Sequence, residues 1–435
     1  VALLGIGLGG LLYTPFGRDR PFGFDAFAIT CALEALFLTV PWALGDRVAL
    51  FALFLRPLGT TGFVGYLLSW TLVTFLVVLP AAMVAGFQFP LLIGLLGRAK
   101  RSVGINEALD YAILTLGSIL GSLAGGFWLL PALSAPGAWK LCVVVLVVLG
   151  VAALGVHRRA SGRAAPATPA LLMVLTLLLV FGTVGPTAFW RHTPIGAGRA
   201  DSFYSKGTKN DLKWHSGERR RAVTWEQDGR ESAVALYTLN DTSFLVNGKS
   251  DGAAVTDAGT QVMGGLLGAL LQPEPVKAAM VIGLGTGSTA GWLGALPDIE
   301  RVDVVELEPA ILHVADVCAP VNRDVLDNPK VAITIADARE VLLTTPRRYD
   351  LVFSEPSNPY RAGIASLFTQ EFYEAVRDRL TPGGVFLQWV QGYEIDAQSI
   401  RIVYATLSSV FGSIETWRTK SADLILVARM EPVPL

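Results

Sequence analysis

The segment SEPSNPYRAG, residues 354–363, contains one carboxylate, Glu355, directly after the strand-like run YDLVFS. A carboxylate at the end of a buried strand can act as a general base when its surroundings move its pKa towards neutrality. Two acids upstream, Asp251 and Asp257, are predicted to share its cleft. Because several carboxylates in one cleft push one another's pKa values apart, these three residues are the candidate acid and base groups.

A second set of residues could hold a nucleoside. Gly283, Gly285 and Gly287 in GLGTG allow a tight turn whose backbone N–H groups approach a ligand closely. Glu306 follows the next apolar run, where a carboxylate can accept both ribose hydroxyls. Asp337 follows the run after that, within reach of an adenine amino group. The three positions together predict a nucleoside pocket, and only one such half is visible, which disfavours a dinucleotide site.

The elements that must position these residues alternate between strand and helix. The runs are KAAMVIGLGTGSTAGWLGAL, RVDVVELEPAILHVADVC, VAITIADAREVLL, YDLVFSEPSNPY and LTPGGVFLQWV. This alternation predicts a parallel, doubly wound sheet, and ligands bind beyond the carboxyl ends of its strands. We expect an α/β Rossmann-like domain over residues 256–435.

The preceding segment, residues 191–255, is predicted to be a linker and a small antiparallel β region. Short runs such as SAVALYTL and TSFLVNG alternate polar and apolar residues from residue 205 onward. A helix is expected to follow, with Asp257 as its N-terminal cap.

Residues 1–190 are predicted to form an α-helical transmembrane domain of about six or seven spans. The apolar stretches are 1–15, 24–44, 62–97, 107–131, 138–157 and 169–189. Because the chain starts at Val1 inside an apolar run, we expect the N-terminus to be truncated. Gly117, Gly121 and Gly125 lie on one helical face and favour close helix–helix packing.

The charges flanking these stretches bear on which side of the membrane residues 191–435 occupy. If 62–97 crosses once, eight basic residues share one side and three the other. The positive-inside rule then makes the first side cytoplasmic and leads residues 191–435 out of the cytoplasm. The larger group is Arg18, Arg20, Arg98, Lys100, Arg101, Arg158, Arg159 and Arg163, and the smaller is Arg47, Arg56 and Lys140.

The overall composition excludes several classes of partner. The net charge of −1 gives no global field for nucleic acid. The three cysteines, Cys31, Cys142 and Cys318, lie far apart, without CxxC or Cys/His spacing. The sequence therefore predicts neither a metal site nor a disulfide framework.

The order GLGTGS, VVELEP, IADARE, SEPSNPY and LTPGGVFLQW resembles the spermidine/spermine synthase family of aminopropyltransferases. FPLL, TLGSILGSLAGGF and SEPSNPYRAGIASLFTQEFY are similar to membrane proteins described as fused major-facilitator/spermidine-synthase proteins. The resemblance implies a class I methyltransferase-like, spermidine-synthase-like fold. It also implies decarboxylated S-adenosylmethionine, or a related nucleoside, as donor, and a small-molecule or peptide amine as acceptor.

The amine side departs from the family pattern. The family's Asp-x-x-Asp-Pro corner matches Glu355 to Pro359, so Glu355 takes the place of the base and Asn358 replaces the second acid. Asp251 takes the place of a glutamine, and Gln261 that of a histidine. Gln261, Asn358 and Tyr360 are the candidate substrate-binding residues.

Four functions remain open at this point. The first is an aminopropyltransferase-like enzyme, which requires a cytoplasmic domain because such donors are cytosolic. The second is an extracytoplasmic domain that modifies a secreted, lipid or peptide amine without a nucleoside donor. The third is a non-catalytic subunit that packs in the bilayer as a homo-oligomer or with partners in a membrane complex. The fourth is transport, for which Glu34 is the one costly carboxylate in a span.

Overall fold

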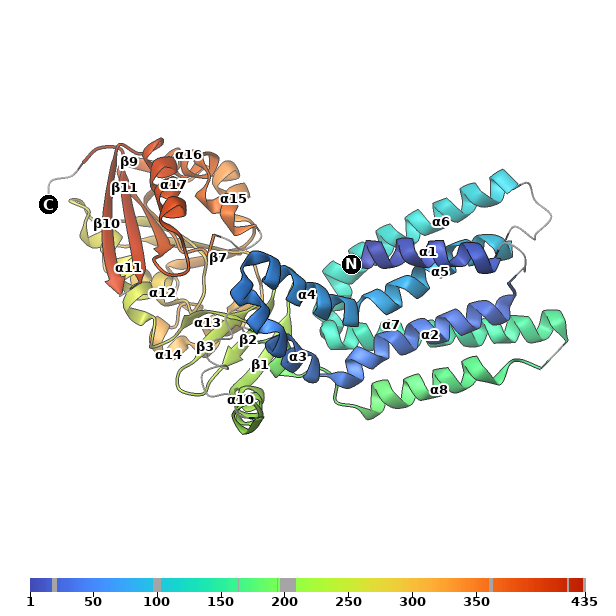
Figure 1. Cartoon of the computed structure of the whole chain (residues 1–435). Coiled ribbons are helices and arrows are strands. Elements are labelled where there is room, and N and C mark those ends of the chain that lie inside the picture. Colours follow the sequence, from blue (N-terminus) through green and yellow to red (C-terminus); the bar gives the residue numbers. More distant parts are fainter. Residues whose placement is uncertain are drawn as a thin grey trace. The chain divides into compact units, whose positions relative to one another are not determined.

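A computed structural model of the chain describes residues 1–17, 22–96, 103–162, 164–193, 195, 209–359, 363–420 and 422–432. The chain divides into two compact units, Val1–Arg221 and Ala222–Leu435 (Figure 1). The predicted boundaries at 190 and 255 differ from this division, because the β region belongs to the same unit as the larger sheet. Tyr360 lies outside the described residues.

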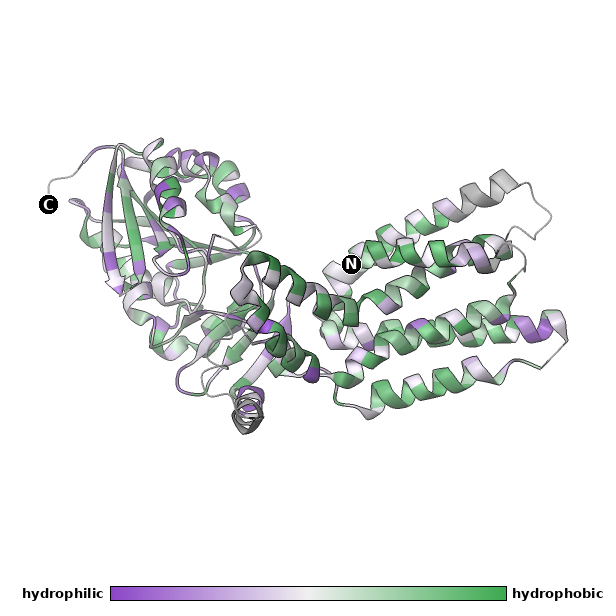
Figure 2. Ribbon diagram, viewed as in Figure 1, coloured by the Kyte–Doolittle hydropathy of each residue, from purple (hydrophilic) through white to green (hydrophobic). Residues whose placement is uncertain are grey.

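The first unit is helical, and most of its helices are mainly hydrophobic (Figure 2). Its elements are α1 (Ala2–Gly17), α2 (Phe24–Leu44), α3 (Arg47–Leu55), η1 (Arg56–Thr61), α4 (Phe63–Val77), α5 (Leu79–Leu96), α6 (Val103–Ala124), η2 (Gly125–Leu129), α7 (Leu130–Ser161), α8 (Ala167–Gly182), α9 (Ala188–Arg191) and α10 (Lys209–Ala222).

Two helical segments among the described residues are long and apolar enough to cross a membrane, Phe24–Leu44 and Tyr111–Ser161. A third candidate is the pair Phe63–Val77 and Leu79–Leu95, which is bent by 56°. The segment Tyr111–Ser161 is interrupted at Ser134, whose φ of 60° is not helical. Ala2–Pro15 and Ala167–Gly182 are shorter apolar helices. The number of membrane spans, expected to be about six or seven, stays a prediction.

Close helix packing in this unit occurs at glycines other than the predicted ones. A Cβ placed on Gly86 of α5 would lie 2.1 Å from the Ile6 carbonyl oxygen, and one on Gly9 would lie 1.9 Å from that of Met83. Helices α1 and α5 therefore approach at backbone distance, as small residues permit. At Gly117, Gly121 and Gly125 a Cβ would meet no described atom within 4 Å.

Two polar side chains inside the first unit have partners. Glu34 on α2 accepts a hydrogen bond from Gln88 Nε2 on α5, at 2.8 Å. The buried Asp46 accepts from Thr187 Oγ1 at 2.6 Å and from Arg220 Nε of α10 at 2.8 Å.

Residues 209–222 form a helix, so the prediction of alternating strands from residue 205 onward is wrong there. Three adjacent arginines and few apolar residues favour an exposed helix over a half-buried strand.

The second unit begins with a four-stranded antiparallel sheet in the order β1-β2-β3-β4. Its strands are Val223–Asp228, Ala233–Tyr237, Ser243–Val246 and Lys249–Ala253. Phe244 packs into the core beside α11 (Ala258–Leu270). The predicted small β region is therefore present from residue 223.

The larger sheet has seven strands in the order β10-β11-β9-β8-β5-β6-β7. Strands β5 (Ala278–Ile282), β6 (Arg301–Glu306), β7 (Val331–Ile335), β8 (Tyr349–Ser354) and β9 (Leu380–Gln391) are parallel, and β10 (Ser413–Lys420) and β11 (Asp423–Arg429) are antiparallel. The predicted α/β Rossmann-like architecture is confirmed, with a mixed rather than wholly parallel sheet.

Helices cover both faces of this sheet because its central strands are apolar on both sides. Val281, Val304 and Phe353 face α11, α12 (Ser288–Gly294), α13 (Ile311–Val317) and α14 (Ala319–Asn322). Met280, Val352 and Phe386 face α15 (Ala338–Thr344), α16 (Gln370–Arg377) and α17 (Ala397–Ser408). The short helix η4 (Ile364–Phe368) follows β8.

Candidate active site in the cleft at the carboxyl ends of the strands

A cleft of about 780 Å³ lies in the second unit where the parallel strands end. The predicted residues that line it are Asp251, Asp257, Gln261, Gly283, Gly285, Glu306, Asp337 and Glu355. Gly287 and Asn358 are not among the lining residues. The sheet thus brings together side chains that are up to about a hundred positions apart, because parallel strands end at one edge.

The glycine turn after β5 needs its glycines for two different reasons. Gly283, Gly285 and Gly287 have φ values of 97°, 53° and 80°, which side chains rarely adopt. A Cβ on Gly283 would also lie 2.9 Å from the Glu355 carbonyl oxygen. Gly287 instead packs against Val325 and Asn322, away from the cleft lining.

Glu306 at the end of β6 holds the turn in place. Its Oε2 accepts from the Leu284 backbone N–H and its Oε1 from that of Glu308, both at 2.9 Å. Burial raises the pKa of its carboxyl, while these backbone hydrogen bonds lower it. The side chain therefore fixes the glycine turn and also borders the cleft.

Asp337 caps α15 and borders the same end of the cleft. Its Oδ1 accepts from the Arg339 backbone N–H at 2.9 Å, and its Oδ2 pairs with the Arg339 guanidinium at 2.5 Å. The hydrogen bond from Arg339 holds the pKa of Asp337 below its usual value. Asp337 is therefore ionised and oriented at neutral pH.

Glu355 is half-buried just beyond β8. Burial, together with the smaller effect of the Asp423 and Asp257 charges, raises its pKa from 4.5 to about 7. A hydrogen bond from Thr289 Oγ1 to Oε2, at 2.8 Å, acts in the opposite direction. A carboxylate with a pKa near neutrality matches the requirement for a general base.

The buried Thr289 hydroxyl links Glu355 to the start of α11. Its oxygen also lies 2.8 Å from the Gln261 carbonyl oxygen, which can only accept. The hydroxyl carries a single hydrogen, so it donates to Glu355 when that residue is ionised and to Gln261 when Glu355 is protonated. The arrangement accommodates both states of the proposed base.

Asp251 and Asn358 hold the Glu355 loop against β4. Asp251 accepts from Lys249 Nζ and from Ser357 Oγ, both at 3.0 Å. The fully buried Asn358 accepts from Lys249 Nζ through its side-chain oxygen. Lys249 thus balances the charge of Asp251 and ties the sheet of β1–β4 to the segment after β8.

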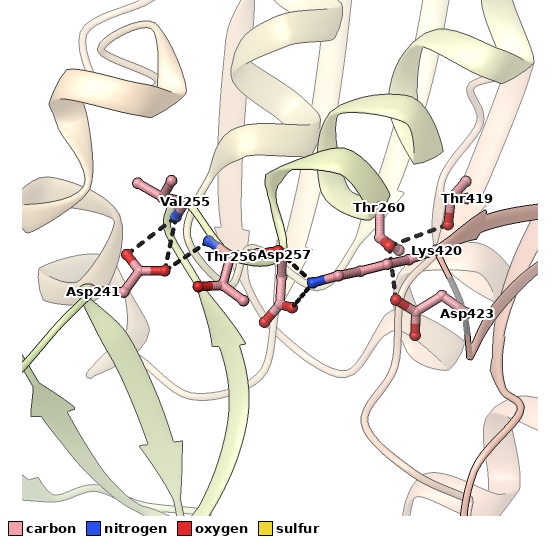
Figure 3. Close-up of polar contacts among 8 residues, drawn as sticks. All are labelled: Asp241, Val255, Thr256, Asp257, Thr260, Thr419, Lys420 and Asp423. Carbon is pink, nitrogen blue, oxygen red and sulfur yellow. Dashed lines mark hydrogen bonds and ion pairs between the residues drawn. The ribbon is translucent and has the colours of Figure 1, made fainter.

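Gln261 and Asp257 lie at the start of α11. Gln261 Oε1 accepts from Thr286 Oγ1 at 2.6 Å, which joins the helix to the glycine turn. Asp257 occupies the N-cap position but makes no capping hydrogen bond, so the predicted cap is wrong. Its carboxylate pairs instead with Nζ of Lys420, the last residue of β10, at 3.4 Å (Figure 3).

Several cleft-lining residues escaped sequence reasoning, among them Thr289, Glu308 and Asp423. Glu308 is buried and accepts from the backbone N–H groups of Glu231 and Ala310. Asp423 begins β11, and because this strand is antiparallel its first residue lies at the edge where parallel strands end. A search limited to the last residues of the predicted strands could not find Asp423. For Glu308 the sequence did offer a signal, because this acid lies in the VVELEP run, two residues after Glu306.

The described lining is strongly acidic. It contains eight acids, Glu231, Asp251, Asp257, Glu306, Glu308, Asp337, Glu355 and Asp423, against Lys249, Arg339 and Lys420. An excess of carboxylates in a cleft favours a cationic ligand. Within the described ranges, no group of three or more His, Cys, Asp or Glu side chains is placed to hold a metal ion.

Comparisons with known proteins agree on the second unit. Residues 263–419 match the spermine/spermidine synthase domain. A polyamine aminopropyltransferase from Nitrosomonas europaea is 30% identical over 152 residues, which cover 35% of this chain and 46% of that protein. One from Mycobacterium tuberculosis is 29% identical over 327 residues, which cover 69% of this chain and 55% of that protein. The chain therefore spans about half the length of the curated relatives it matches.

The match to the Mycobacterium tuberculosis protein reaches beyond the second unit. Residues 222–435 make up about half of the chain, and the match covers 69% of it, so part of the helical unit is shared. Among solved structures, a spermidine synthase in complex with the transition-state analogue AdoDATO is 19% identical, with a TM-score of 0.45 over 48% of this chain and 74% of that one. Spermidine synthase from Thermotoga maritima is 19% identical, with a TM-score of 0.44 over 48% and 73%. Residues 263–419 of this chain are therefore similar in sequence to the spermine/spermidine synthase domain.

Proposed function

We propose that the second unit transfers an aminopropyl or related alkyl group from an S-adenosylmethionine-derived sulfonium donor to an amine. The amine nitrogen attacks the carbon next to the sulfonium sulfur, and the carbon–sulfur bond breaks with its electrons going to sulfur. A neutral thioether leaves, and Glu355 takes the proton that the attacking nitrogen gives up. The step needs no metal and no redox partner.

One observation carries this proposal: the glycine turn, Glu306, Asp337 and Glu355 line one cleft. The first three lie at the ends of β5, β6 and β7, which suits a nucleoside. Glu355 follows β8, the strand that pairs with β5 on the side away from β6. A nucleoside over β5–β7 would therefore place its reactive sulfonium beside the proposed base.

The charge of the cleft supports the same reaction. A sulfonium donor and an amine are both cationic, and the described lining carries five more acids than bases. The positive charge of the sulfonium disappears as the carbon–sulfur bond breaks, so the acidic lining serves donor binding and the base serves turnover. The names of the relatives from Nitrosomonas europaea and Mycobacterium tuberculosis point to polyamines as acceptors.

We further propose that the helical unit holds the chain in a lipid bilayer. Phe24–Leu44 has 21 residues, and a helix of that length spans roughly 30 Å, the thickness of a bilayer core. Large apolar side chains of α6 and α8 are exposed, among them Leu116, Leu123 and Leu178. Lipid would cover such faces.

Binding of the thioether product tests the proposed reaction. The full chain in detergent should unfold at a higher temperature in the presence of 5′-methylthioadenosine. At a hundredfold excess of this ligand over its dissociation constant, the free energy of unfolding should rise by about 2.7 kcal/mol. Adenosine lacking the thioether should protect less. Incubation with decarboxylated S-adenosylmethionine and a panel of amines should release the same thioether. Absence of both protection and release would reject the proposed function.

A further inference from the structure

A lysine lies buried in the acidic lining of the cleft. Lys249, the first residue of β4, lines the cleft and is only 4% exposed. A buried lysine requires partners, because its ammonium group has lost the water that would otherwise surround it. Asp251 lies two residues further along the same strand, so the two side chains point to the same face. Lys249 Nζ donates a hydrogen bond to Asp251 Oδ1 at 3.0 Å.

The segment after the proposed base completes the surroundings of this ammonium group. Lys249 Nζ also donates to Asn358 Oδ1, and Ser357 Oγ donates to Asp251 Oδ2 at 3.0 Å. The Asn358 amide thus presents its oxygen to Lys249, although its buried Nδ2 then has no partner among the described residues. A carboxylate and an amide oxygen are acceptors suited to an alkylammonium ion, which can only donate. The chain itself supplies that ion.

The ammonium group of Lys249 changes what the cleft can bind near Glu355. Lys249, Asp251, Ser357 and Glu355 all line the same cleft. A second ammonium group of a ligand that approached Asp251 would find this carboxylate already paired, and Lys249 would repel it. Repulsion between like charges is strong at a buried position because water screens it little. This part of the cleft therefore disfavours a ligand with a second positive charge.

We propose that Lys249 determines the class of acceptor. It fills the ammonium position at Asp251 with the chain's own amine, so the acceptor is a monoamine whose remaining part is neutral. Apolar side chains of the lining are available to contact that part, among them Ile364, Leu367 and Trp389. This inference rests on the proposed function and departs from the polyamines that the names of the relatives suggest.

Thioether release from decarboxylated S-adenosylmethionine tests this on the full chain in detergent. The acceptors are butan-1-amine and butane-1,4-diamine, and the measured quantity is the ratio of kcat/KM for the diamine to kcat/KM for the monoamine. The wild type should favour the monoamine. Lys249→Met keeps a long side chain but leaves the Asp251 charge unpaired by Lys249. The ratio should then rise roughly ten- to hundredfold, the usual effect of a charge-assisted hydrogen bond.

Further variants separate the charge of Lys249 from its structural role. Lys249→Met combined with Asp251→Asn should give a ratio much closer to that of the wild type, because no carboxylate remains there for the diamine. Lys277→Met is the matched control, since Lys277 is exposed, pairs with Glu300 and does not line the cleft. Its ratio should equal that of the wild type.

Melting temperatures show whether each variant is folded. Lys249→Gln replaces Lys249→Met if the latter does not fold, because the glutamine amide still donates to Asp251 while the positive charge is gone. The ratio should rise in Lys249→Gln as well. A lysine that served only to hold β4 against the segment after β8 would change the melting temperature and leave the ratio unchanged.

The outcomes separate this inference from the proposed function. Thioether release with an unchanged ratio in Lys249→Met overturns the assignment of Lys249 and leaves the proposed reaction standing. A wild type that favours the diamine also overturns it. Protection by 5′-methylthioadenosine without release, from either amine in the wild type and in Lys249→Met, overturns it as well. If there is neither protection nor release, the proposed function fails and the inference fails with it.

Discussion

At the scale of single residues, Glu355 and Thr289 determine the acid–base behaviour of the cleft. Burial raises the pKa of Glu355 to about 7, and the Thr289 hydroxyl has an acceptor in either protonation state. At neutral pH a substantial fraction of Glu355 is therefore ionised and can accept a proton, while protonation needs no rearrangement.

Replacing Glu355 with Gln should separate chemistry from structure. The variant keeps the size and most hydrogen bonds but cannot accept a proton, so turnover should fall 10²–10⁴-fold, the typical contribution of a general base. Its melting temperature should not fall. The exposed Glu340, changed to Gln, is the control and should keep full turnover. Turnover per folded molecule that is unchanged in Glu355→Gln would remove this residue from the mechanism.

The pKa of Glu355 also predicts a pH dependence of stability. Its pKa is higher in the folded state than the value of 4.5 expected when unfolded, so the folded state keeps this proton longer. The contribution of Glu355 to the free energy of unfolding is complete below about pH 4.5 and is lost as the pH rises to about 7. The total loss is roughly 3 kcal/mol at most. The free energy of unfolding of Glu355→Gln, relative to wild type, should therefore increase over this interval. A pH-independent difference would mean that the pKa is not raised.

At the scale of elements, the glycine turn after β5 positions both halves of the cleft. Glu306 holds the turn through the Leu284 backbone N–H, and Gly283 lies against the Glu355 carbonyl group. A displacement of this turn therefore moves Glu306, at the proposed nucleoside site, and the proposed base Glu355 together.

Gly283→Ala tests this coupling against a matched glycine. Gly283 has a φ of 97° and its Cβ would lie 2.9 Å from the Glu355 carbonyl oxygen, whereas Gly383 has a φ of 83° and no neighbour within 4 Å. Both variants should lose about 1–2 kcal/mol from backbone strain. Only Gly283→Ala should also lose nucleoside affinity, measured by calorimetry with 5′-methylthioadenosine. Equal affinity in the two variants would contradict the coupling.

At the scale of the whole molecule, a helical unit and a synthase-like unit are joined in one chain. The Mycobacterium tuberculosis relative shares part of both. The positive-inside rule, applied to the basic residues of the sequence, predicts that residues 191–435 lie outside the cytoplasm, whereas the proposed donor is cytosolic. The bent pair Phe63–Val77 and Leu79–Leu95 decides between them, because a re-entrant pair reverses every later segment.

We expect the full chain to remain in the membrane fraction after alkaline carbonate extraction, because lipid would surround the apolar faces of its helices. Protease added to intact spheroplasts should leave the second unit uncleaved, since the proposed donor is cytosolic. Permeabilised spheroplasts provide the control in which it is cut. Release by carbonate would contradict the bilayer anchor. Cleavage in intact cells would favour modification of an extracytoplasmic amine.

Local sequence was sufficient to predict the Rossmann-like unit, the glycine turn and the strand-end positions of Glu306, Asp337 and Glu355. Period-two and apolar runs report the strands directly, and parallel strands deliver their last residues to one edge. Sequence failed at residues 209–222, which form a helix, and at the cap predicted for Asp257. In both cases the pattern fits more than one local structure, and partners from distant segments are present, Asp46 for α10 and Lys420 for Asp257.

Sequence alone therefore predicted that Glu306, Asp337 and Glu355 share one cleft at the carboxyl ends of the strands, as the structure has them. Only the tertiary structure decided which acids in that cleft are paired with cations, since Lys420 at the end of β10 reaches Asp257 beside α11. It also decided that Asp423 faces the cleft, because an antiparallel strand brings its first residue to the edge where its neighbours end. Charge pairing and strand direction depend on contacts between segments distant in sequence, and no local pattern records them.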